Sequence, residues 1–205
     1  MTIASEEVLA SAISTINPDG IAALVEISSI PNYQFNSNDD FVLVLDRIQD
    51  PGNMGNLFRT ALAAGVDAIF LAGGAHPLSQ KVLRASSGAV FHLPFQRFEG
   101  AEEDIINSLL KSLSELSNLG FQVFSTRSHN KSSKKISKPY WEIDWTKSTV
   151  LILGNEGQGI NKKIQEAFNE TITIPHSELV ESLNVACVAV PLLLERKRVA
   201  FTSNT

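Results

Sequence analysis

Two polar segments of this 205-residue sequence contain residue types that could bind a ligand or do chemistry. Residues 46–59 read DRIQDPGNMGNLFR, in which glycines permit close backbone approach, Asn53 is a candidate helix cap, and Arg59 carries a fork of donors suited to phosphate. Residues 153–159 read LGNEGQG. No Lys-Ser/Thr pair follows these glycines and Glu156 would repel phosphate, so they favour a neutral or cationic ligand over a phosphate loop.

A third polar segment, residues 174–185, reads IPHSELVESLNV and leads into an apolar stretch. Ser182 is the candidate N-cap of the helix that should follow. Capping does not account for Asn184, a mediocre helix former at an otherwise apolar helix start. Taken singly, each of the three segments also fits an ordinary turn or cap.

The elements that must position these segments alternate between strand-like and helix-like patterns. Short apolar runs predict strands over 41–45, 68–71, 90–95, 121–124, 149–153 and 171–174. Apolar periodicity predicts helices over 57–64, 79–85, 102–119 and 160–168, and from Ser182 onward. This alternation predicts an α/β fold with a mostly parallel sheet and helices on both faces, whose ligands bind where the strands end.

The first 40 residues form a separate predicted piece. A short helix is expected over 1–14, a strand over 21–27 and a linker over 31–40. This piece is too small for a core of its own, which leaves residues 41–205 as the main domain.

The three segments together resemble a known family. The first motif is N-x-G-x-x-x-R (Asn53, Gly55, Arg59), with Gly65 beyond it. The LGNEGQG segment follows, and then Ile174-Pro175 and SLNV over 182–185. Residues 84–89 (RASSGA) add a further likeness. Over residues 41–199 the chain resembles the SpoU (TrmH-type) family of RNA ribose 2′-O-methyltransferases, within the SPOUT α/β-knot superfamily.

The resemblance implies a C-terminal deep trefoil knot, S-adenosylmethionine as cofactor, and a homodimer with shared active sites. It implies a catalytic group of Asn53, Arg59, Glu156, Ser182 and Asn184. It implies cofactor contacts, largely through backbone, from Leu153, Gly154, Asn155, Gly159, Ile174, Pro175 and Leu183.

The N-terminal piece has a resemblance of its own. Residues 15–25 resemble the end of the ribosomal-protein-L30e-like substrate-binding domain found in many members of the family, so residues 1–40 are interpreted as a remnant of that domain plus a linker. His176 and Glu178 depart from the family pattern after Ile-Pro, and Pro191 should bend or restart the last helix.

In the implied reaction a ribose 2′-hydroxyl attacks the methyl group of the cofactor. Arg59 is the activator proposed for the family, and clamping the neighbouring phosphate is an equally physical role because free arginine stays protonated. No metal is needed, since a sulfonium already provides a good leaving group. The predicted substrate is ribosomal RNA rather than transfer RNA. A non-catalytic RNA-binding homologue, a base-nitrogen methyltransferase and a Rossmann-type enzyme are less favoured alternatives.

Charge and composition limit the partners. The 17 Lys and Arg against 22 Asp and Glu exclude a wholly basic coat, but Arg127, Lys131, Lys134, Lys135 and Lys138 form an acid-free run that predicts RNA contact. One cysteine cannot form an intrachain disulfide. Without a basic, apolar N-terminal signal or a run of 18 apolar residues, a cytoplasmic protein without a membrane span is expected.

Overall fold

The computed structural model of this chain describes residues 3–13, 20–26, 30–31, 33–127, 137–155, 157–177 and 179–203. The chain divides into two compact units, Met1–Ile30 and Pro31–Thr205. The first unit contains α1 (Glu6–Ala12), which Ser5 caps by accepting a hydrogen bond from the Val8 N–H. Residues 21–26 are exposed and carry no regular structure, so the strand predicted over 21–27 is wrong in its described part. No other strand of the described first unit is available to pair with it.

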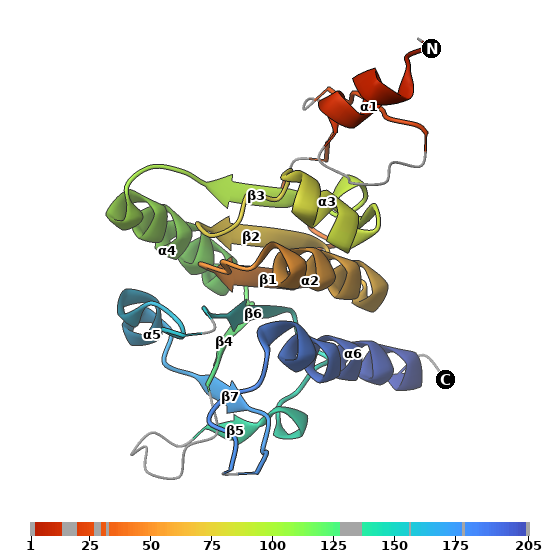
Figure 1. Cartoon of the computed structure of the whole chain (residues 1–205). Coiled ribbons are helices and arrows are strands. Elements are labelled where there is room, and N and C mark those ends of the chain that lie inside the picture. Colours follow the sequence, from red (N-terminus) through yellow and green to blue (C-terminus); the bar gives the residue numbers. More distant parts are fainter. Residues whose placement is uncertain are drawn as a thin grey trace. The chain divides into compact units, whose positions relative to one another are not determined.

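The second unit is built on one parallel sheet (Figure 1). Its strands are β1 (Phe41–Asp46), β2 (Ala68–Ala72), β3 (Phe95–Phe98), β4 (Gln122–Thr126), β5 (Lys138–Pro139), β6 (Thr149–Leu153) and β7 (Thr171–Thr173), in the order β3-β2-β1-β6-β4-β7-β5. Every pairing between these strands is parallel, which confirms the predicted α/β class. Every residue of β1, β2 and β6 is buried, as expected for strands covered on both faces.

Helices cover the two faces of the sheet (Figure 1). The helices α2 (Pro51–Ala64), α3 (Gln80–Ser86) and α6 (Val185–Ser203) contribute to one apolar core, and α4 (Glu102–Asn118) and α5 (Lys162–Ala167) to the other. Leu45 of β1 is in register with Leu153 of β6, so the first two polar segments begin side by side at the carboxyl edge of the sheet.

The strand predicted over 90–95 is wrong because a glycine and a proline interrupt it. Instead of a strand over 90–95, a 3₁₀ turn (Ala89–Phe91) follows Gly88, whose φ of 85° breaks an extended path. Strand β3 begins only after Pro94, which has no N–H to donate. The two-residue strand β5 was not predicted.

The last helix begins later than predicted and does not restart at proline. It starts at Val185 rather than Ser182 and continues through Pro191 as one helix. Arg196 holds the second half of this helix in place: the residue is 7% exposed, and its guanidinium donates to the carbonyls of Trp145, Lys147 and Asp40 at 2.7–3.1 Å. This contact ties α6 to the amino ends of β1 and β6. Within the described ranges, no helix is both long and apolar enough to cross a membrane.

Candidate active site

The first polar segment enters α2 through a cap that the sequence analysis assigned to the wrong residue. Asp50, not Asn53, is the N-cap: its Oδ1 accepts from the Asn53 N–H at 2.7 Å, and Pro51 occupies the first helical turn. Asn53 therefore lies inside the helix, half-buried, and its side-chain carboxamide is not used for capping.

The carboxamide of Asn53 meets the third polar segment. Asn184 Nδ2 donates to Asn53 Oδ1 at 3.1 Å, across 131 residues of sequence. Asn184 is also the cap of α6, because its Oδ1 accepts from the N–H groups of Ala186 at 2.9 Å and Cys187 at 3.3 Å. The prediction of Ser182 as cap is wrong: Ser182 is exposed and lies three residues before the helix.

Arg59 lies on the exposed side of α2 and faces α3. Its Nη1 donates to Ser87 Oγ at 3.5 Å, and Ser87 adopts a left-handed conformation at the end of α3. The two helices approach so closely at Gly55 that an added Cβ would lie 2.7 Å from the Ser86 backbone nitrogen. The glycine thus lets α3 present Ser87 to the guanidinium of Arg59.

The second polar segment folds back on itself at the end of β6. Asn155 Oδ1 accepts from the N–H groups of Gly157 and Gln158 at 2.8 and 2.9 Å, and the Gly159 N–H donates to the Asn155 carbonyl. A Cβ on Gly154 would lie 2.5 Å from the Ile160 nitrogen and 2.6 Å from the Gly159 carbonyl carbon. Leu153 is fully buried in β6, whereas Glu156 lies outside the described residues.

The third polar segment exposes apolar surface beside the end of β7. Ile174 is half-buried against the α2–α6 core, Pro175 is exposed, and Leu183 is 38% exposed. Leu179 and Val180 are 96% and 46% exposed. An apolar ring system resting here would cover side chains that the chain alone leaves open to water.

A buried hydroxyl lies next to this apolar surface. Thr173, 4% exposed at the carboxyl end of β7, has an Oγ1 without a hydrogen-bond partner among the described residues. Such an atom marks a place where a polar partner is expected. The donor set around the segment therefore fits a nucleoside-like group, with apolar contacts and a few backbone and hydroxyl partners.

The predicted RNA-binding residues are only partly described. The Arg127 N–H donates to the Ile172 carbonyl of β7, and Lys138, which is exposed, is in register with the same residue from the other side. Lys131, Lys134 and Lys135 lie outside the described residues.

Sequence reasoning missed Asp46 and Arg47, which join the first and second segments. Asp46 is completely buried at the end of β1, and Arg47 donates to Gln158 Oε1 at 3.1 Å. A charge directly after a continuous apolar strand was the available signal. Among the residues with described structure, no group of three or more His, Cys, Asp or Glu is arranged to hold a metal ion.

An ion pair connects α4 and α5, the two helices on the other face of the sheet from α2 and α6. Lys163 Nζ lies 2.7 Å from Glu103 Oε1, which joins α5 to the first turn of α4. The hydrogen bond and the charge of Lys163 lower the pKa of the Glu103 carboxyl below its ordinary value.

Comparisons with known proteins agree with this arrangement. The model of the SpoU rRNA methylase family matches residues 40–194. An uncharacterized tRNA/rRNA methyltransferase of Synechocystis is 35% identical over 99% of this chain and 69% of its own length. The Bacillus subtilis 23S rRNA (guanosine(2553)-2′-O)-methyltransferase RlmP is 34% identical over 92% of this chain and 69% of its own length.

A solved relative shows the same fold. The AdoMet-bound rRNA methyltransferase of Sinorhizobium meliloti superposes with a TM-score of 0.71, at 27% identity, over 95% of this chain and 70% of that one. The family match and these relatives, together with the three segments that converge at one sheet edge, identify this protein as a methyltransferase. The chain belongs to the SpoU rRNA methylase family, which confirms the resemblance drawn from its motifs.

Proposed function

We propose that this protein transfers a methyl group from S-adenosylmethionine to a ribose 2′-hydroxyl of ribosomal RNA. The observation that carries the proposal is the hydrogen bond between Asn53 and Asn184, which unites the first and third motif segments. Arg47 joins the second segment to the first in the same way. Three motifs spread over 131 residues therefore converge at one sheet edge, as a two-substrate site requires.

S-adenosylmethionine, the predicted cofactor, supplies an electrophilic methyl on a sulfonium leaving group. The solved Sinorhizobium relative has it bound. In this chain the residues that would hold it are the exposed apolar side chain of Leu183 and the backbone around Gly154 and Ile174. The Thr173 hydroxyl, buried without a described partner, is a further polar group at this place.

Arg59 is the residue that we assign to the RNA. Arg59 is exposed, and its guanidinium makes one long described contact, to Ser87 Oγ at 3.5 Å. It clamps the phosphate next to the target ribose and donates toward the 2′-oxygen, which stabilises the negative charge that develops on this oxygen as the hydroxyl proton passes to solvent. The Asn53–Asn184 pair orients the ribose, and Glu156 and Ser182 complete the predicted catalytic group.

The proposal includes the finer structural predictions of the family. A C-terminal knot is supported by the sheet order, because β6 lies between β1 and β4 and β7 lies between β4 and β5. A homodimer is supported by Val190 and Leu194, each 42% exposed on α6. Residues 1–40 remain proposed as a remnant of an L30e-like domain plus a linker.

Ribosomal RNA is favoured over transfer RNA by the name of the matching family and by the 23S rRNA relative from Bacillus. Arg127 and Lys138, on either side of β7, are proposed to contact its phosphates together with Lys131, Lys134 and Lys135. The Synechocystis relative carries both RNA classes in its name, which keeps transfer RNA as the second candidate.

The test is methyl transfer from labelled S-adenosylmethionine to unmodified ribosomal and transfer RNA, with the position of the methyl group read by nuclease digestion. Arg59→Ala should abolish transfer while cofactor affinity and thermal stability stay at parental values. Arg59→Lys should not restore transfer, because an ammonium lacks the planar fork. Unchanged turnover in Arg59→Ala, or methylation of a base nitrogen, would contradict the proposal.

A further inference from the structure

Arg47 occupies a conformation that the surrounding structure must hold in place. It follows β1 at the carboxyl edge of the sheet with a φ of 55°, a left-handed value that only Arg47 and Ser87 adopt among the described non-glycine residues. Such conformations are unfavourable for residues with long side chains and persist only where contacts enforce them.

The contacts of Arg47 begin with its neighbour. Its Nε and Nη2 donate to the two carboxylate oxygens of Asp46 at 3.0 and 3.2 Å. The Asp46 side chain is completely buried, and its Oδ2 also accepts from the Asn161 N–H at 2.7 Å. A fork on a buried carboxylate fixes the plane and the direction of the guanidinium.

Arg47 also donates to the 154–159 segment, the part of the second polar segment that follows the last residue of β6. Nη1 donates to Gln158 Oε1 at 3.1 Å and Nη2 to the Gly159 carbonyl at 3.3 Å. The Arg47 carbonyl accepts from Asn155 Nδ2 at 2.9 Å. One residue of the first segment therefore holds the second segment at three points.

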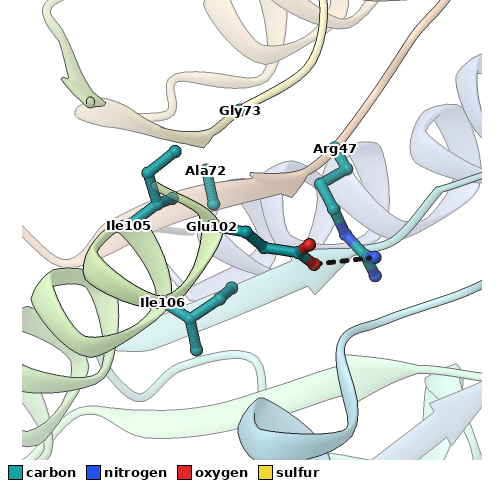
Figure 2. Close-up of a pocket in the computed structure, with 6 residues that line it drawn as sticks. All are labelled: Arg47, Ala72, Gly73, Glu102, Ile105 and Ile106. Atoms are coloured by element: carbon teal, nitrogen blue, oxygen red, sulfur yellow. Dashed lines mark ion pairs between the residues drawn. The ribbon is translucent and has the colours of Figure 1, made fainter. Parts of the chain in front are cut away.

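On its other side Arg47 faces α4. Its Nη1 lies 3.6 Å from Glu102 Oε1, the ion pair drawn in Figure 2, at the rim of a cavity of about 210 Å³. Ala72, Gly73, Ile105 and Ile106 line the rest of this cavity. The guanidinium thus stands between the first turn of α4 and the 154–159 segment.

We infer that Arg47 is a positioning residue that holds the 154–159 segment in the conformation that receives the cofactor. The segment contains three glycines, and its described internal contacts are short-range bonds around Asn155. External contacts from Arg47 to Asn155, Gln158 and Gly159 therefore limit the conformations that the backbone of this segment can adopt. This inference rests on the proposed function, because it assumes that the cofactor binds at this segment.

Arg47→Asn tests this role by removing the contacts of the guanidinium with the segment. Asparagine tolerates the left-handed conformation, but its side chain is too short to reach Gln158. It also leaves the buried Asp46 carboxylate without its ion pair, so the thermal midpoint should fall, and binding is measured well below that midpoint. Losing two hydrogen bonds to the segment corresponds to about a tenfold rise in Kd for S-adenosylhomocysteine by calorimetry. The KM for S-adenosylmethionine should rise by a similar factor with little change in kcat.

Arg97→Asn is the matched control. The Arg97 side chain is 23% exposed, close to the 19% of Arg47, and it contacts the Ala75 carbonyl and Glu99 rather than the 154–159 segment. This variant should keep the parental Kd even if its thermal midpoint falls.

Gln158→Ala supplies an independent check. It should weaken binding less than Arg47→Asn, because it removes only one of the two hydrogen bonds. The Arg47→Asn/Gln158→Ala double variant should bind about as weakly as Arg47→Asn alone, because that substitution already removes the Gln158 contact. Parental affinity in Arg47→Asn, or fully additive effects in the double variant, would overturn the inference while leaving the proposed function intact. Failure of the parent protein to bind the probe would overturn both.

Discussion

Asn184 has two roles: it caps α6, and it donates a hydrogen bond to Asn53 of the first motif segment. Two substitutions separate these roles. Asn184→Ala removes both the acceptor for the Ala186 and Cys187 N–H groups and the donor to Asn53. Losing an N-cap costs about 1 kcal/mol. For a chain of this size that lowers the thermal midpoint by about 2–4 °C.

Asn184→Asp keeps the cap and removes only the donor. Aspartate caps as well as asparagine, and its charge at a helix N-terminus adds about 0.3–1 kcal/mol. That gain offsets the loss of one exposed hydrogen bond, worth about 0.5–1.5 kcal/mol. We therefore expect the urea midpoint of Asn184→Asp to stay near the parental value. Its carboxylate, however, repels Asn53 Oδ1, so kcat/KM for methyl transfer should fall at least about tenfold.

The assays are urea unfolding followed by circular dichroism and methyl transfer to ribosomal RNA. Ser79→Ala is the control for capping alone, because Ser79 caps α3 by accepting from the Val82 N–H. It should lose comparable stability and keep its activity. Parental activity in Asn184→Asp would refute the functional role of the Asn53 contact. Parental stability in Asn184→Ala would refute the capping argument.

Three glycines give further expectations. Gly154→Ala should lower both cofactor affinity, measured by calorimetry, and thermal stability, measured by melting, since its Cβ would lie 2.5 Å from the Ile160 nitrogen. Gly157→Ala is the control and should change neither quantity, because its Cβ would meet nothing nearer than 3.6 Å. Equal behaviour of these two variants would contradict the folded-back segment. Gly55→Ala should destabilise the protein by about 1–3 kcal/mol in urea titrations, because α2 and α3 meet there at backbone distance; a parental midpoint would show that α3 moves away freely.

The sheet was predictable where burial leaves a continuous apolar pattern. The prediction for β6 matches Thr149–Leu153 at both ends, because every residue of that strand is buried. Prediction failed over 90–95, where apolar residues fill a 3₁₀ turn against the core rather than a strand. An apolar pattern alone does not distinguish a buried 3₁₀ turn from a buried strand. Gly88 before the turn and Pro94 before β3 were the residues that indicated the break in the strand.

The site was predictable as a set of segments but not as a set of contacts. The glycines and asparagines identified three segments, and parallel topology placed their strands along one edge. The cap of α6 was misassigned because Ser182 and Asn184 are both good caps, and only the fold shows which one precedes the first helical residue. Arg47 was missed because its partners Gln158 and Gly159 are more than 100 residues away.

The position of Asn184 follows from contacts at the far end of its helix. Arg196, 12 positions further along α6 in the sequence, is bound to the carbonyls of Asp40 and Trp145. Because a helix is stiff, this anchor limits how far Val185 can shift along the sheet, and Asn184 precedes Val185 directly. The Asn53–Asn184 bond then aligns two rigid helices, α2 and α6, instead of two loops. Such a site holds its geometry before RNA arrives, which is the condition under which positioning alone supplies much of a rate.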